Sequence, residues 1–166
     1  VGSEMCIRDR RYVLYDNQET FVPLTKEVEF IQNYIELMRI RVSSAVKINT
    51  NFQIRPDSQS PVAPLLFISL IENAFKHGIS PTEPSFIDIM LTEKDDEIHC
   101  VIRNSNYPKN AMDKSGSGIG LEQVRKRLEL LYAGRYEWHQ QISSNQKEYS
   151  SILTIKIPDN NKKILP

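Results

Sequence analysis

The chain has 166 residues, with 21 basic and 21 acidic side chains, so its formal net charge is zero. This balance argues against a nucleic-acid-binding protein that depends on a basic surface. No apolar run in the sequence approaches the roughly 18 residues that a membrane span needs. The 2 cysteines lie far apart and provide neither a disulfide framework nor a set of metal ligands. The length is that of one folded domain with a core of its own.

The first ten residues differ in character from the rest of the chain. Residues 3–10 read Ser-Glu-Met-Cys-Ile-Arg-Asp-Arg, which is the translation of a sequencing adapter, and residues 1–10 are therefore not expected to contribute to the fold. A native polar start is the alternative interpretation. If residues 1–10 derive from an adapter, native sequence begins near Arg11 and any upstream segment, including a membrane segment, is missing.

Hydrophobic periodicity predicts three helices and five strands along the rest of the chain. In chain order, the expected elements are a helix over 24–42, a strand over 46–54, a helix over 64–77, strands over 86–92 and 98–103, a loop over 104–117, a helix over 121–131, and strands over 136–142 and 149–157. The paired strands indicate a mixed, mainly antiparallel sheet. We therefore expect an α+β fold, a two-layer sandwich with the helices packed on one face of the sheet.

The second predicted helix carries a polar stripe on a mostly apolar background. The stripe consists of Ser69, Glu72, Asn73, Lys76 and His77, at positions i, i+3, i+4, i+7 and i+8. These positions share one face of a helix. A helix this apolar is mostly buried, and polar groups at its edge need partners. A polar ligand with a metal ion would provide them, and a solvated face on a surface helix is the alternative.

Two further features resemble parts of a ligand site. The segment Gly116–Leu121 reads Gly-Ser-Gly-Ile-Gly-Leu and comes directly before the third predicted helix. Glycines allow close approach to an anion, and the N–H groups at a helix start bind phosphate; the spacing matches neither a Walker A loop nor the dinucleotide fingerprint. Asn104, at the end of a predicted strand, can donate and accept hydrogen bonds and so could contact an adenine edge. A structural role for Asn104 in a turn is the alternative.

Taken together, these motifs resemble those of the LytS-type sensor histidine kinases. The segment Ile71–Gly78, Ile-Glu-Asn-Ala-Phe-Lys-His-Gly, is similar to their N-box. Residues 116–121 and the following helix over 124–132 are similar to their G2 box, and residues 24–41 are similar to their linker. The resemblance extends from residue 11 to residue 158.

The resemblance implies a domain organisation. Residues 11–45 would be the end of the helical histidine-kinase region with its linker helix. Residues 46–158 would form a Bergerat-type (GHKL) ATP-binding domain, and residues 159–166 a polar tail. The implied fold agrees with the α+β sandwich expected from the elements alone.

The resemblance also implies ATP and Mg²⁺ as cofactors and assigns residues to them. Asn73 would be the metal ligand, in a site completed by waters and phosphate oxygens. The residues implied to bind the nucleotide are Asn73, Lys76, His77, Asn104, Gly116, Gly118, Gly120 and Leu121. Glu72 is implied as the catalytic carboxylate that polarises the nucleophile.

The sequence departs from the family pattern at two places. The usual adenine-reading box is Asp-x-Gly-x-Gly, whereas residues 104–108 read Asn-Ser-Asn-Tyr-Pro. Asn104 can still accept a hydrogen bond from the adenine amino group, so binding is expected to persist. Ser69 lies one helical turn before Asn73, where relatives carry a larger amide or acid, and this disfavours an ATPase that activates water with a glutamate there.

The implied function is that of a protein histidine kinase in a two-component system. It would transfer the γ-phosphoryl group of ATP to a histidine on a missing upstream segment, and then to a response regulator. The chain lacks that histidine and is expected not to autophosphorylate alone. The resemblance further implies a homodimer through the missing helical region, and a cytoplasmic domain of an inner-membrane protein. The alternative is a degenerate, non-catalytic GHKL module that signals through protein contacts.

Overall fold

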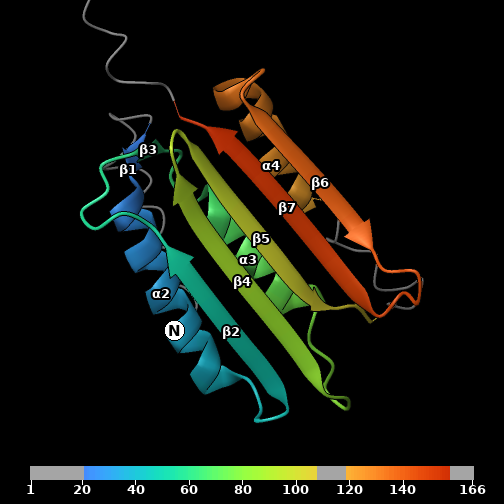
Figure 1. Ribbon diagram of the computed structural model, residues 1–166. Coiled ribbons are helices and arrows are strands. Elements are labelled where there is room, and N and C mark those ends of the chain that lie inside the picture. The colour runs from blue at the N-terminus through green and yellow to red at the C-terminus, as the bar shows by residue number, and fades with distance from the viewer. Residues whose placement is uncertain (1–20, 108–118, 158–166) are drawn as a thin grey trace, which may run out of the picture.

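The computed structural model describes residues 21–107 and 119–157. A five-stranded sheet carries three helices on one of its faces (Figure 1). The helices are α2 (Leu24–Arg41), α3 (Leu66–His77) and α4 (Ile119–Tyr132), and the strands of the sheet are β2 (Val46–Gln53), β4 (Ser85–Lys94), β5 (Glu97–Ser105), β6 (Tyr136–Ile142) and β7 (Glu148–Lys156). This arrangement confirms the predicted α+β sandwich.

The strand order of the sheet is β2-β4-β5-β7-β6. Strands β2 and β4 pair in parallel, and the other three pairs are antiparallel. A parallel pair needs a crossover connection, and α3 provides it on the covered face of the sheet. The prediction of a mixed, mainly antiparallel sheet is therefore confirmed.

The core lies between the sheet and the three helices. Helix α2 contributes Leu24, Val28, Ile31 and Ile35 to it, because these residues recur at helical spacing and are all at most 5% exposed. The buried side chains of α3, α4 and the inner face of the sheet belong to the same cluster. Helix α2 therefore packs as part of the sandwich.

A two-stranded sheet outside the main one was not predicted. It consists of β1 (Val22–Pro23) and β3 (Pro61–Val62), which pair antiparallel. Strands of two residues are too short to produce a periodic pattern. The pair joins the chain just before α2 to the chain just before α3, so the starts of the two helices are held together.

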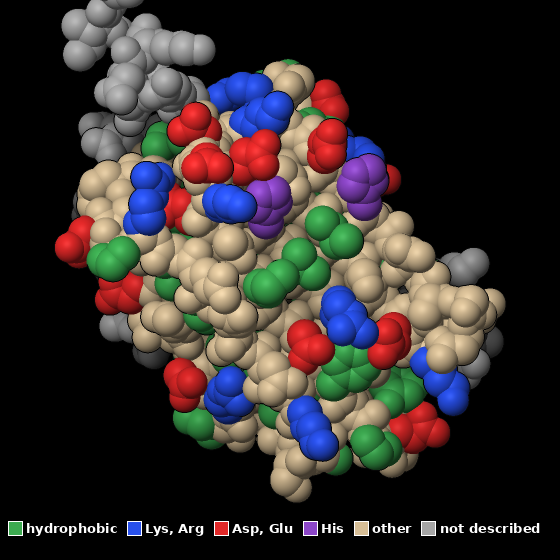
Figure 2. Space-filling view, viewed as in Figure 1, with side chains coloured by type: hydrophobic (Ala, Val, Ile, Leu, Met, Phe, Trp, Pro, Cys, Tyr) green, Lys and Arg blue, Asp and Glu red, His purple; other side chains and the backbone are tan. Residues whose placement is uncertain are grey.

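The second face of the sheet is not covered by helices. Figure 2 shows this face, where charged and polar side chains surround a small hydrophobic group. Met90 and Ile152 belong to the exposed hydrophobic residues, with exposed fractions of 39% and 40%. No helix in the described part of the chain is both long and apolar enough to span a bilayer.

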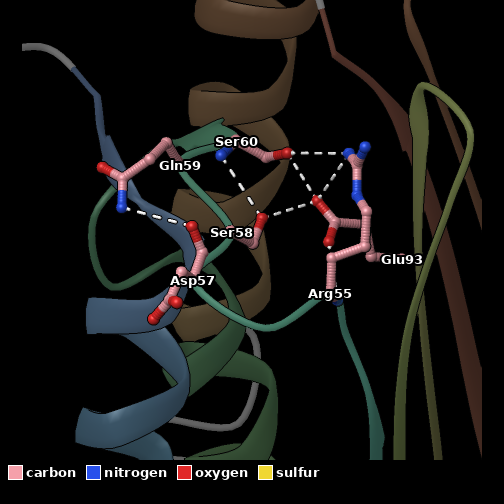
Figure 3. A network of polar contacts seen from close by, with 6 residues as sticks. All are labelled: Arg55, Asp57, Ser58, Gln59, Ser60 and Glu93. Atoms are coloured by element: carbon pink, nitrogen blue, oxygen red, sulfur yellow. Dashed lines mark hydrogen bonds and ion pairs between the residues drawn. The ribbon is translucent and has the colours of Figure 1, made fainter.

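A buried carboxylate connects the loop after β2 to the sheet (Figure 3). The side chain of Glu93, on β4, is fully buried. It accepts hydrogen bonds from the hydroxyls of Ser58 (2.7 Å) and Ser60 (2.5 Å) and from the backbone N–H (3.0 Å) and the guanidinium (3.2 Å) of Arg55. Burial alone would raise the pKa of Glu93, but the hydrogen bonds from Arg55, Ser60 and Ser58 outweigh it and lower the pKa to about 2.

This network predicts an acid-dependent contribution to stability. Because the folded state lowers the pKa of Glu93 from 4.5 to about 2, its contribution is fully present above pH 4.5 and is lost as the pH falls toward 2. The contribution is about 3 kcal/mol in the free energy of unfolding. Urea unfolding from pH 6 to pH 2 should show a shallower acid slope for Glu93→Gln than for the wild type. The exposed Glu137→Gln is the control, and an unchanged slope in Glu93→Gln would contradict the role of the network.

Candidate functional site

Helix α3 is held at its start by side chains from the two flanking helices. Glu27 of α2, itself 0% exposed, accepts a hydrogen bond from the Leu65 N–H at 3.1 Å. From α4, Arg127 donates to the Pro64 carbonyl at 2.5 Å, and the Tyr132 hydroxyl accepts from the Ala63 N–H at 2.8 Å. Segment 63–65 is thus held from both sides. The N–H groups at a helix start have no partner within the helix, and the buried Glu27 carboxylate accepts the one of Leu65.

The polar stripe of α3 lies along the side of the helix that does not face the core. Ser69, Asn73 and His77 are half-buried, and Glu72 and Lys76 are exposed. The Ser69 hydroxyl donates to the Leu65 carbonyl at 2.9 Å, within the helix itself. Ser69 therefore uses its hydroxyl locally, as side chains of its kind do in helices.

The stripe has two edges that face different neighbours. Glu72 and Lys76 line a hollow of about 290 Å³ between α3 and α2. On that side the ring of Tyr34 meets the ring of Phe75 edge to face, with centroids 5.7 Å apart. By helical geometry, Asn73 lies on the opposite edge of the stripe, away from α2. The stripe predicted from the sequence therefore has two different surroundings: Glu72 and Lys76 lie beside α2, and Asn73 lies on the edge away from it.

The hollow between α2 and α3 combines apolar walls with charged groups. The remaining lining residues are Leu37, Met38 and Arg41 of α2. Burial raises the pKa of Tyr34 to about 12, and the carboxylate of Glu72 contributes in the same direction. The Tyr34 hydroxyl is therefore protonated at neutral pH and available as a donor.

Asn104 lies buried where β5 meets the end of α3. Its exposed fraction is 2%, and its side-chain N–H donates to the Ser105 carbonyl at 2.8 Å. The Oδ1 atom is buried and has no hydrogen-bond partner among residues 21–107 and 119–157. A buried acceptor without a partner is costly unless a ligand provides the donor. The chemistry of this atom fits the amino group of an adenine base.

Gly78 ends α3 as predicted, but its small size matters for another reason. Its φ of −95° is right-handed, so the glycine is not needed for a left-handed cap. A Cβ at this position would lie 2.7 Å from the Ala74 carbonyl oxygen and 2.8 Å from Nδ2 of Asn104. The absent side chain therefore allows the end of α3 to approach Asn104 closely.

One further polar atom was missed by sequence reasoning. The Tyr149 hydroxyl, on β7, is buried and has no hydrogen-bond partner in the part of the chain that the structure describes, as is true of the Asn104 oxygen. Tyr149 pairs directly with Asn104 across the two strands. A tyrosine in a strand of alternating residues does not by itself indicate a functional site. The pairing of Tyr149 with Asn104 in the strand register is what could have identified it.

The glycine-rich segment is described only in part. Gly116 and Gly118 lie outside the described residues. Gly120 is exposed in the first turn of α4, and a Cβ there would meet no atom of the described residues within 4 Å. Leu121 is half-buried and packs against the core.

Sequence comparisons relate the chain to bacterial sensor kinases. A family model described as histidine kinase matches residues 8–46. The chain is 27% identical to the sensor protein LytS of Oceanobacillus iheyensis over 89% of its own length and 27% of the relative. It is 27% identical to the sensor histidine kinase YpdA of Escherichia coli over 74% of its length and 23% of the relative. The chain spans about a quarter of the length of these curated relatives.

Solved structures with a similar fold are also histidine kinases. The catalytic domain of histidine kinase ThkA covers 82% of this chain and 96% of its own, with a TM-score of 0.57 and 16% identity. The histidine kinase domain of a blue-light activated kinase from Erythrobacter litoralis covers 84% of this chain and 63% of its own, with a TM-score of 0.57 and 13% identity. At these identities the likeness shows the shared fold.

The three lines of comparison agree with the motifs and with the observed sandwich. The family model matches the region of α2, the curated relatives match most of the chain, and the structural neighbours match the sheet with its helices. This chain is similar in sequence to LytS and related sensor histidine kinases, and it has the fold of histidine kinase catalytic domains.

Proposed function

We propose that this chain binds Mg-ATP and serves as the catalytic domain of a sensor histidine kinase. The observation that carries the proposal is the buried, unpartnered Oδ1 of Asn104, next to Gly78 at the end of the N-box helix. An acceptor in this state needs a donor from outside the chain, and the amino group of adenine is such a donor. The fold of the structural neighbours supports the same ligand.

The remaining site residues of the proposal are those that the motifs imply. Asn73 would provide a side-chain oxygen to Mg²⁺, which neutralises charge on the phosphates when bound. Lys76 and His77 would contact the phosphates or the ribose. Gly116, Gly118, Gly120 and Leu121 would form the part of the site at the start of α4, where the N–H groups of a helix start favour phosphate.

The proposed reaction is phosphoryl transfer to a histidine. The histidine nitrogen would form a bond to the γ-phosphorus as the bond to the β,γ-bridging oxygen breaks, and ADP would leave. Glu72 is the carboxylate proposed to accept the histidine proton. It lines the hollow beside α2, so the acceptor would approach from that side. The phosphoryl group would then pass to an aspartate of a response regulator.

The rest of the protein is part of the same proposal. The acceptor histidine would lie on an upstream helical segment, through which two copies would form the dimer. The chain would be the cytoplasmic part of a membrane-anchored sensor. Mixing this chain with such a histidine-bearing segment and ATP labelled at the γ-phosphate should label the segment, whereas the chain alone should acquire no label.

A second candidate is a degenerate GHKL module that signals through protein contacts. The observation in its favour is the sequence Asn-Ser-Asn-Tyr-Pro at residues 104–108, where the family has Asp-x-Gly-x-Gly. Calorimetric titration of ATP into the chain, with Mg²⁺ and with EDTA, separates the two candidates. We expect Mg²⁺-dependent binding below about 1 mM, the upper range of ordinary enzyme affinities. No binding at that concentration would favour the non-catalytic module.

A further inference from the structure

Tyr149 and Asn104 lie side by side on the covered face of the sheet. The register pairs Ile87 of β4 with Asn104, and Asn104 with Tyr149 of β7. Directly opposed residues on adjacent strands share a face. Ile87 is 0% exposed in the core, so this row faces the helices. In β7, Leu153 lies on the same side by alternation and is also 0% exposed.

The row lies at the end of the sheet where the proposed nucleotide site begins. One residue further, the Ser105 hydroxyl donates to the carbonyl of Gly78, the residue that ends α3. One residue beyond that, the Asn106 N–H donates a hydrogen bond to the Lys147 carbonyl at 2.8 Å, and this bond continues the pairing of β5 with β7 at this end. Tyr149 is therefore as near to this end of the sheet as Asn104 is.

Both side chains end in buried polar atoms that have no hydrogen-bond partner among the described residues. These are Oδ1 of Asn104 and the hydroxyl of Tyr149. Because the Asn104 N–H is engaged by the Ser105 carbonyl, the group that Asn104 offers is an acceptor. Burial raises the pKa of Tyr149 above its usual value, so its hydroxyl keeps its proton and is a donor at neutral pH.

An acceptor beside a donor is the complement of one edge of adenine. Adenine presents an amino group at position 6, and its neighbouring ring nitrogen N1 is an acceptor. Guanine presents a carbonyl and an N–H at the same two places. A pocket with the Asn104 oxygen and the Tyr149 hydroxyl would satisfy adenine and leave both groups mismatched with guanine. Mismatched buried polar groups discriminate strongly between ligands.

We propose that Tyr149 is a specificity-determining residue of the nucleotide site, donating its hydroxyl proton to N1 of adenine while Asn104 accepts from the amino group. This inference rests on the proposed function, since it requires a nucleotide at this end of the sheet. It adds to that function a residue on β7 and a reason for selecting adenine.

The test compares Tyr149→Phe with the wild type in calorimetric titrations with ATP and with 1-deaza-ATP, which lacks the N1 acceptor. We expect the wild type to bind ATP about tenfold more tightly than 1-deaza-ATP, which is the effect of one hydrogen bond. Tyr149→Phe should bind both nucleotides with the same weaker affinity. Its unfolding temperature without nucleotide should be unchanged or higher, because no protein hydrogen bond is lost.

Tyr136→Phe is the matched control. Its hydroxyl contacts Glu129 on the exposed surface, and its affinity for ATP should equal that of the wild type. If Tyr149→Phe still prefers ATP to 1-deaza-ATP as the wild type does, or if it loses only thermal stability, the inference is wrong and the proposed function stands. If the wild type binds no ATP, the proposed function fails and this inference fails with it.

Discussion

Replacement of Asn73 by alanine is expected to abolish Mg-ATP binding and to leave the fold intact. The side chain is half-buried on the polar stripe of α3, and its amide makes no hydrogen bond within residues 21–107 and 119–157. Its removal therefore breaks no hydrogen bond of the described structure, while alanine is the better helix former. Loss of the proposed oxygen ligand should weaken Mg-ATP at least about 100-fold, measured by calorimetry.

The control for this substitution is an exposed asparagine of the same chain. Asn51 lies on β2 at the edge of the sheet, and Asn51→Ala should bind Mg-ATP like the wild type. The unfolding temperature of Asn73→Ala should equal or slightly exceed that of the wild type. Retained affinity in Asn73→Ala would remove this residue from the site.

Gly78→Ala is expected to reduce both stability and nucleotide affinity. The added Cβ would lie 2.7 Å from the Ala74 oxygen and 2.9 Å from the Cβ of Asn104. Because one neighbour is helix backbone and the other is a buried side chain, neither can move away freely. Overpacking of this kind costs about 1–3 kcal/mol, measurable by urea unfolding. A displaced Asn104 should also weaken ATP binding in the same protein.

Gly120 provides the matched control for stability. A Cβ there meets no atom of residues 21–107 and 119–157 within 4 Å, and Gly120 lies in helix α4. Gly120→Ala should therefore keep or raise the free energy of unfolding, by up to about 1 kcal/mol. Equal stability of Gly78→Ala and Gly120→Ala would show that the end of α3 can relax around the new methyl group, contrary to this account.

The large elements could be predicted from sequence because each follows one strong rule. Helices α2 and α3 bury residues at helical spacing, and the paired strands alternate on one buried face. The parallel pairing of β2 with β4 is not visible in either strand. It follows from the crossover through α3.

The start of helix α3 could not be predicted exactly, because it depends on tertiary contacts. Helix α3 begins at Leu66, and Leu65 before it has a left-handed φ of 63°, a conformation that leucine rarely adopts. The bond from the Leu65 N–H to Glu27 comes from a residue far away in sequence. Local propensity cannot anticipate such a partner. The same holds for Glu93 and the serines of the loop after β2.

The sequence supplies the candidate residues of the site, whereas their arrangement in space comes from the structure. The spacing places Glu72 and Asn73 on one stripe, whereas only the position of α2 shows that Glu72 lines a separate hollow. Asn104 was identified from a motif, and its orphaned oxygen is a property of packing. Tyr149 was identified only from the strand register. A residue of this sort can be recognised once the pairing of the strands is known.

The most direct measurement of the central claim follows the side-chain amides of Asn73 and Asn104 by NMR. A ¹⁵N-labelled sample is titrated with ATP in the presence of Mg²⁺, and then with ADP and with GTP. This account predicts that both NH₂ signals shift and saturate together with Mg-ATP, and that GTP moves the Asn104 signal far less. If both signals stay unchanged at saturating Mg-ATP, the nucleotide does not bind between the N-box helix and the end of β5.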